Sequence, residues 1–98
     1  MADGDALRGS VEQGFGAIKI KIGVGDLTWD LTNVAAVRAI IGPDVRLMVD
    51  YNQSLSAPEA IRRIEVLARF DLAWVEEPVP AEDLAGHARV RAASCVPI

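Results

Sequence analysis

Two lysines in an otherwise apolar segment are the first residues of this sequence that could do chemistry. Lys19 and Lys21 alternate with isoleucines over residues 17–22, so they share one face of a predicted strand. In an antiparallel sheet that face would be a solvated surface, whereas a parallel sheet covered on both faces would bury both ammonium groups. Two neighbouring lysines also lower each other's pKa, and a lysine brought toward neutrality can remove a proton from carbon.

Two carboxylates close the next two predicted strands. Asp50 ends one of them, with Asn52 on the same face, and Glu76 ends the other, before Glu77 and Pro78. Asp50 could instead cap the following turn, and the two glutamates could belong to an ordinary polar loop. If the strands are neighbours, however, the carboxylates repel each other unless a cation lies between them. Oxygen ligands without His or Cys favour Mg²⁺, with Mn²⁺ as the alternative.

The elements that must position these residues alternate regularly along the chain. Strands are expected at residues 17–22, 45–51 and 72–76, with the start of a fourth at 95–98, and four helices at 5–13, 27–41, 57–70 and 81–93. Strand spacings of nearly 30 residues leave room for helical crossovers and are too long for hairpins. The pattern therefore predicts an α/β fold with parallel strands and right-handed connections.

Length, charge and composition exclude several classes of protein. The chain has 98 residues, whereas a closed eight-stranded α/β barrel needs about 250. Fourteen acidic residues against ten basic ones give a net charge of −4, so nucleic acid is not an expected partner. The acidic N-terminus does not resemble a secretory signal, and no apolar run is long enough for a membrane span, so we expect a cytoplasmic protein. Cys95 and His87 occur singly; we expect a buried Cys95 and a surface His87, with no disulfide and no zinc site.

The sequence resembles the enolase superfamily, and within it the mandelate racemase/muconate lactonizing enzyme group. The matching segments are residues 14–23, which contain the two lysines, residues 47–55, which read Leu-Met-Val-Asp-Tyr-Asn-Gln-Ser-Leu, and residues 74–78, which read Trp-Val-Glu-Glu-Pro. Each motif is weak alone, but their order and their spacing, 29 residues from Lys21 to Asp50 and 26 from Asp50 to Glu76, make the resemblance specific. It extends from about residue 6 to residue 98.

The resemblance implies a segment of a TIM-type (β/α) barrel and a role for each candidate residue. Lys21 would remove the proton α to a substrate carboxylate, and Lys19 would hold that carboxylate and lower the pKa of Lys21. Asp50 and Glu76 would be Mg²⁺ ligands, and Asn52 would hydrogen-bond a substrate oxygen. The reaction would give a metal-stabilised enediolate, as in a racemase or an acid-sugar dehydratase acting on a small carboxylate substrate such as a 2-hydroxy acid or acid sugar.

Residues 1–98 are expected to form a single unit, because no linker-like segment divides them. We expect it to lack the third metal ligand, the second acid/base residue, the N-terminal capping domain and the later barrel strands of such enzymes. Whether the chain alone is an enzyme therefore stays open at this point. The alternative is a truncated, non-catalytic α/β module that self-associates to cover its open strand edges, and a homo-oligomer is expected in either case.

Overall fold

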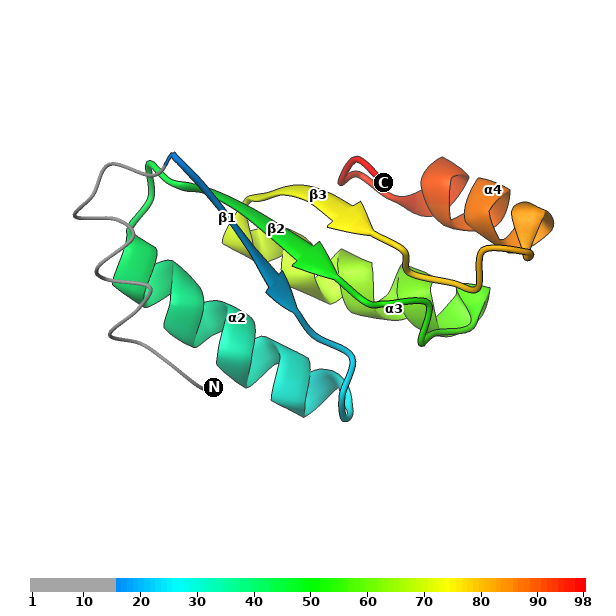
Figure 1. Cartoon of the computed structure of the whole chain (residues 1–98), viewed down its shortest axis with the longest axis horizontal. Coiled ribbons are helices and arrows are strands. Elements are labelled where there is room, and N and C mark those ends of the chain that lie inside the picture. The colour runs from blue at the N-terminus through cyan, green and yellow to red at the C-terminus, as the bar shows by residue number, and fades with distance from the viewer. Residues whose placement is uncertain (1–15) are drawn as a thin grey trace.

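A computed structural model of the chain describes residues 16–98 (Figure 1). The order of elements is β1 (Ala17–Lys21), α2 (Leu27–Ile41), β2 (Arg46–Asp50), α3 (Ala57–Leu67), the short 3₁₀ helix η1 (Ala68–Phe70), β3 (Leu72–Glu76) and α4 (Leu84–Ala93). These elements confirm the α/β alternation predicted for this part of the sequence. The helix expected at residues 5–13 lies outside the described residues.

The three strands form one parallel sheet in the order β1-β2-β3. Lys21 pairs with Asp50, and Asp50 pairs with Glu76, so the last residues of the three strands stand in one row. The ladder continues one step further, since the Tyr51 N–H donates to the Glu76 carbonyl at 3.0 Å. The predicted parallel arrangement is confirmed, and its carboxyl edge brings the candidate residues together.

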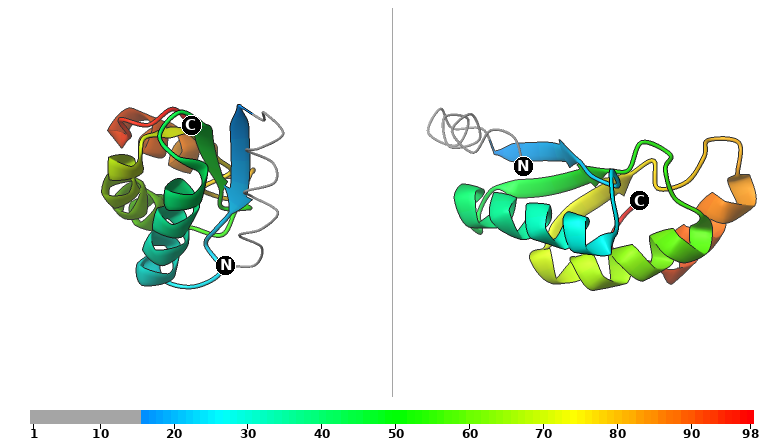
Figure 2. Two further views of the ribbon diagram at one scale, coloured as in Figure 1. Left: turned by 90° about the vertical axis from the view of Figure 1, so that its left-hand side faces the viewer. Right: turned by 90° about the horizontal axis from the view of Figure 1, so that it is seen from below.

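Helices α2 and α3 lie on one side of the sheet (Figure 2). The core between them consists of alternate strand residues, such as Leu47, Val49 and Val75, and of buried helix residues, such as Val37 and Ile64. Within residues 16–98 no helix covers the other side of the sheet, and Lys19 and Lys21 are exposed there. The expectation that the lysine-bearing face is buried is therefore wrong for the part of the chain described, because both packed helices use the opposite face.

That uncovered face is polar as well as apolar. Strand alternation and register place Lys19, Lys21, Met48, Asp50, Trp74 and Glu76 on it. The face carries both lysines and both carboxylates, so it is suited to binding a charged ligand or ion.

Side-chain caps set where each of the α-helices α2, α3 and α4 begins. The side chains of Asp26, Ser56 and Asp83 accept backbone N–H groups in the first turns of α2, α3 and α4, respectively. Because Asp83 is the cap, α4 begins at Leu84, three residues later than predicted. The helix expected to run to residue 70 ends as α-helix at Leu67 and continues as η1.

Residues 95–98 do not form the expected fourth strand. One backbone hydrogen bond of the kind that a ladder would have is present, from the Val75 N–H to the Pro97 carbonyl at 2.9 Å. Pro97 has no N–H to donate, so it cannot extend the ladder in the usual way. Cys95 is exposed, contrary to the expectation that it is buried, whereas the neighbouring Val96 packs into the core. No helix in the described part of the chain is long and apolar enough to cross a membrane.

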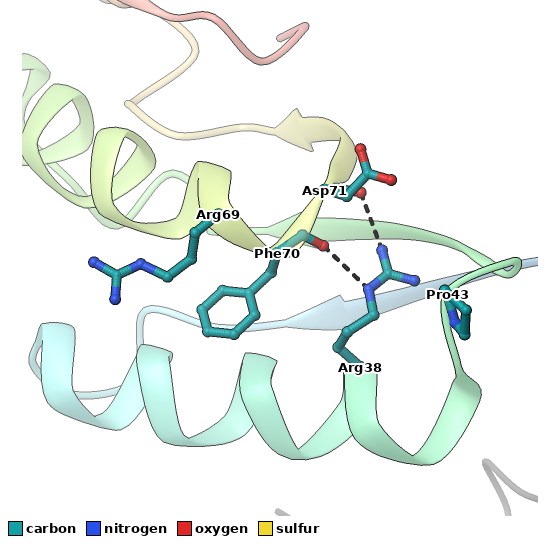
Figure 3. A pocket seen from close by; sticks show the side chains of 5 residues that line it. All are labelled: Arg38, Pro43, Arg69, Phe70 and Asp71. Atoms are coloured by element: carbon teal, nitrogen blue, oxygen red, sulfur yellow. Dashed lines mark hydrogen bonds between the residues drawn. The ribbon is translucent and has the colours of Figure 1, made fainter.

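Arg38 of α2 makes hydrogen bonds at the amino ends of the strands, the edge of the sheet opposite to the candidate residues. Its guanidinium lies at a shallow pocket of about 160 Å³ and donates to the carbonyls of Phe70 and Asp71 at 3.1 and 3.0 Å (Figure 3). It also donates to the carbonyls of Gly42 and Val45 at 3.0 and 2.7 Å. One side chain therefore holds the two connections that lead into β2 and β3.

Substituting Arg38 with methionine should lower the free energy of unfolding by about 2–3 kcal/mol, because four carbonyls lose a charged donor. Urea denaturation followed by circular dichroism measures this loss. Arg69→Met is the matched control at the same pocket: Arg69 is exposed and its Nε donates to one carbonyl, that of Val66. It should cost less than about 1 kcal/mol. Equal losses for the two variants would contradict the bracing role of Arg38.

Candidate active site at the carboxyl edge of the sheet

The carboxyl edge of the sheet brings together the residues singled out in the sequence. Lys21, Asp50 and Glu76 are register partners across the three strands, as the parallel arrangement predicted. Lys19 lies two residues earlier in β1, on the same face. Ligands of parallel α/β proteins bind at this edge, because the loops that follow the strands surround it.

The ammonium group of Lys19 lies between the two carboxylates. Its Nζ is 2.9 Å from Glu76 Oε2 and 3.8 Å from Asp50 Oδ2. The Lys19 and Glu76 side chains are each about 40% exposed, whereas that of Asp50 is 10% exposed. One oxygen of each carboxylate is therefore turned toward the same positive charge.

The other oxygen of each carboxylate is held by an N–H group. Asp50 Oδ1 accepts from the backbone N–H of Asn52 at 2.7 Å, and Glu76 Oε1 accepts from the indole N–H of Trp74 at 3.3 Å. The two acids thus have matching arrangements, with one oxygen oriented by the protein and one facing the cation. Such orientation by neighbouring donors is what metal-binding carboxylates use.

The contact with Glu76 reverses one expectation about the lysines. The hydrogen bond to Glu76, followed by the charge of that carboxylate, raises the pKa of Lys19 above its usual range. The same hydrogen bond, together with that from Trp74, lowers the pKa of Glu76. Lysine neighbours were expected to lower each other's pKa, and for Lys19 this is wrong because the Glu76 carboxylate lies 2.9 Å from its ammonium group.

The turn that follows β2 carries unusual backbone geometry. Asn52 and Gln53 have φ angles of 51° and 65°, and the Ser54 N–H donates to the Tyr51 carbonyl at 3.1 Å, which closes a tight turn. Glu77, just after β3, also has a positive φ, of 48°. Three of the four non-glycine residues with positive φ in residues 16–98 thus border the site, and such strain is often found at functional sites.

Asn52 contributes its backbone N–H to the site, where it donates to Asp50 Oδ1. Its side chain is exposed, and the hydrogen bond expected from that side chain to a substrate oxygen stays a prediction. The neighbouring Gln53, which sequence reasoning did not single out, accepts from the Ala81 N–H at 2.9 Å and so ties this turn to the loop after β3. In the sequence, its position next to Asn52 could have identified Gln53 as a residue near the site.

Trp74 is a second residue that sequence reasoning did not place at the site. It is half-buried on the carboxylate-bearing face, and its indole N–H donates to Glu76 Oε1. The guanidinium carbon of Arg46 lies 5.5 Å from the centre of its ring, a cation–π contact that fixes the indole. Strand alternation was the signal, since residues 74 and 76 share a face.

The donors at this site suit a hard divalent cation. Asp50 and Glu76 supply carboxylate oxygens that already converge on a cation, the Lys19 ammonium. No group of three or more His, Cys, Asp or Glu residues that could hold a metal ion occurs within residues 16–98. Two carboxylates with the remaining positions left to water or substrate is a common way to bind Mg²⁺.

Fold and site together define an α/β protein of parallel (β/α) units with an acidic and basic ligand site at the carboxyl ends of its strands. Comparison with known families gives the same answer, because the family model described as Enolase C-terminal domain-like matches residues 3–98. The chain belongs to this family, and its relatives are members of the mandelate racemase/muconate lactonizing enzyme group of the enolase superfamily.

Several curated relatives are named for reactions of sugar acids or their lactones, and another is named a hydrophobic dipeptide epimerase. The chain is 49% identical over 86 residues to D-galactarolactone cycloisomerase of Agrobacterium fabrum, which covers 88% of the chain and 22% of that enzyme. It is 42% identical over 89 residues to L-talarate/galactarate dehydratase of Salmonella typhimurium, covering 91% of the chain and 22% of the dehydratase. The chain thus spans less than a quarter of these relatives' length.

Solved structures agree with the fold. A Bradyrhizobium enolase complexed with magnesium and mandelic acid superposes with a TM-score of 0.92 at 53% identity, covering 96% of the chain and 26% of that protein. L-Talarate dehydratase from Polaromonas, complexed with Mg and L-glucarate, gives a TM-score of 0.87 at 38% identity, covering 97% of the chain and 28% of the dehydratase. The three-stranded parallel sheet and its helices are therefore an arrangement that these proteins share.

Proposed function

We propose that the chain is the part of a Mg²⁺-dependent enzyme that removes the proton α to a carboxylate. The observation that carries the proposal is the row at the carboxyl edge. There, Asp50 and Glu76 each direct one carboxylate oxygen toward the Lys19 ammonium group, and Lys21 is the register partner of Asp50. Relatives named as cycloisomerases and dehydratases, and structures named as complexes with magnesium, support this assignment.

Each residue has a distinct role in the proposed reaction. Asp50 and Glu76 would hold Mg²⁺, which when bound neutralises negative charge that develops on the substrate carboxylate. Lys21 would accept the α-proton on its Nζ. Lys19 would leave the carboxylate pair to bind the substrate carboxylate, and the exposed Asn52 amide would donate a hydrogen bond to a substrate oxygen.

The names of several relatives and the charge of the site support the proposed substrate class. Two lysines favour an anionic ligand, and the relatives' names include galactarate, talarate and galactarolactone. We propose a 2-hydroxy acid or an acid sugar, with racemisation or dehydration as the outcome. Both outcomes begin with the same proton transfer, so the four charged residues described here serve either one.

We further propose that residues 1–98 act as one segment of a TIM-type (β/α) barrel. Three parallel strands with helices on one side are the arrangement that such a barrel repeats. Two carboxylates and two lysines are part of the site of such an enzyme, so turnover draws on further residues as well. Metal binding and proton exchange test the contribution of this segment separately from full turnover.

The test is α-proton exchange of 2-hydroxy acids and acid sugars in D₂O with Mg²⁺ present, followed by proton NMR. Loss of the α-proton signal is expected with the wild-type sequence and not with Lys21→Met, which removes the base. Arg62→Met is the matched control, since Arg62 is exposed on α3 and should leave the rate unchanged. If the wild type shows neither metal binding nor α-proton exchange, the enzymatic proposal is refuted.

A second candidate function is a non-catalytic module that self-associates. The observation that favours it is the sheet itself: in residues 16–98, β1 and β3 each form a ladder only with β2, and one face has no covering helix. Exposed strand edges pair readily with other chains. Under this hypothesis the chain folds and associates without binding Mg²⁺.

A homo-oligomer is expected under either function. Multi-angle light scattering at micromolar concentration should give a mass of at least two chains, each of 10.5 kDa. Dilution should shift the mass toward the monomer, because association depends on concentration. A mass of one chain at every concentration would contradict the prediction.

A further inference from the structure

A buried carboxylate on α2 links the segments that carry the candidate catalytic residues. Asp30 is fully buried and accepts three hydrogen bonds. Its Oδ1 accepts from the Gly23 N–H at 2.9 Å, and its Oδ2 accepts from the Tyr51 hydroxyl at 2.8 Å and from Arg63 Nη1 at 3.0 Å. The three donors come from the loop after β1, the residue that follows β2, and helix α3.

Two of these donors are adjacent in sequence to the site. Gly23 is two residues after Lys21, and Tyr51 directly follows Asp50. Between them, the Ile22 N–H donates to the Asp50 carbonyl at 2.9 Å. The Tyr51 N–H in turn donates to the Glu76 carbonyl at 3.0 Å. Asp30 therefore connects the chain after β1 with the chain after β2, and the Tyr51 N–H connects both to the end of β3.

The packing at Gly23 shows how tightly these connections are built. Gly23 has a φ of +83°, which favours glycine. A Cβ atom there would lie 2.6 Å from Cδ1 of the Tyr51 ring and 2.7 Å from Ser54 Oγ. The backbone after Lys21 thus packs closely against the Tyr51 ring, with no room for a side chain at residue 23.

The surroundings of the Tyr51 hydroxyl favour its protonated form. Burial, and then the charge of Asp30, raises the pKa of the Tyr51 hydroxyl far above its usual range, so it remains a donor. Arg63 supplies the opposite charge, and it also donates to the Gly25 carbonyl and to Glu59, both at 3.0 Å. A buried ion pair is expensive to desolvate, and an important use of such a pair is to specify one geometry.

We propose that Asp30, Tyr51 and Arg63 are positioning residues that hold the lysine-bearing end of β1 in register with the metal-binding end of β2. The inference rests on the proposed function, since it concerns the same Lys21 and Asp50. None of the three residues is proposed to touch substrate. They act through Gly23 and through the backbone of residues 50–52.

The test compares Tyr51→Phe with the wild type. The substitution removes one hydroxyl and keeps the ring that packs on Gly23. Mn²⁺ affinity, measured by electron paramagnetic resonance, should fall about 10-fold, as it does when support for a metal ligand is lost. Amide hydrogen exchange at Gly23, measured by NMR, should become several-fold faster. Thr32→Val is the matched control, because the Thr32 hydroxyl bonds within α2 and is exposed, and both readouts should stay unchanged.

The outcomes separate this inference from the proposed function. If the wild type binds no Mn²⁺, the proposed function fails, whereas faster Gly23 exchange in Tyr51→Phe still supports the positioning role. If Tyr51→Phe lowers the melting temperature but leaves Mn²⁺ affinity and Gly23 exchange unchanged in the folded protein, the cluster is only structural and the inference is overturned. Asp30→Asn tests the other side of the same hydrogen bond, and it should shift both readouts in the same direction.

Discussion

Replacing Asp50 with asparagine should weaken Mn²⁺ binding at least about 100-fold, which corresponds to about 2.7 kcal/mol. The amide keeps the shape of the side chain and can still accept the Asn52 N–H, but it removes one of the two negative charges at the site. Coulomb attraction between charges a few ångströms apart near a protein surface is worth several kcal/mol, so the loss is large. Isothermal titration calorimetry with Mn²⁺ or Mg²⁺ measures it directly.

Two further variants show whether that effect belongs to the site. Asp44→Asn removes a negative charge from the exposed loop before β2, at the opposite edge of the sheet, and should change the affinity less than about twofold. Lys19→Met should strengthen metal binding, because the ammonium group that now lies between the two carboxylates no longer competes. Equal weakening by Asp50→Asn and Asp44→Asn would rule out binding at the carboxyl edge.

Replacing Arg63 with methionine should reduce the free energy of unfolding by about 3–5 kcal/mol. The Arg63 side chain is 10% exposed and pairs with Asp30, whose side chain has no exposure. Removing the guanidinium leaves a buried carboxylate without its counter-charge and takes a donor from the Gly25 carbonyl. A domain of this size has a total stability on the order of 5–10 kcal/mol, so the variant would be close to unfolding. Urea denaturation measures the difference.

The neighbouring arginine provides the control for this prediction. Arg62 stands next to Arg63 on α3, pairs with the same Glu59 and has a side chain that is 57% exposed. Arg62→Met should cost less than about 1 kcal/mol, because exposed ion pairs contribute little. If both variants lose the same stability, the buried pair with Asp30 is not the reason for the effect.

Much of the fold could be predicted from local patterns. The strand at residues 72–76 and the helix at 27–41 have the predicted bounds, because apolar periodicity and an Asp cap determine such elements locally. The expected adjacency of Asp50 and Glu76 is also confirmed, since parallel strands joined by helical crossovers align their carboxyl ends. The roles of these residues in catalysis stay predictions.

Other features could not be predicted, because they depend on contacts between distant segments. The Lys19 ammonium pairs with Glu76, 57 positions away, so its pKa is raised rather than lowered. Trp74 has a large apolar side chain of the kind that often packs in a core, yet it lies on the carboxylate-bearing face with the Arg46 guanidinium over its ring. Residues 95–98 have an apolar pattern typical of a strand, but they share a single backbone hydrogen bond with β3, from the Val75 N–H to the Pro97 carbonyl.

The sequence by itself determined which chemical groups reach the carboxyl edge. Two lysines alternate in one strand and one acid ends each of the next two, and strand geometry then requires a shared face and a shared edge. Only the tertiary structure decided how those groups are used. The pairing of Lys19 with both acids, the N–H donors that orient Asp50 and Glu76, and the buried Asp30 cluster behind them all require side chains from separate strands and helices to meet. Sequence periodicity specifies the direction of a side chain, whereas its partner depends on packing between segments far apart in the chain.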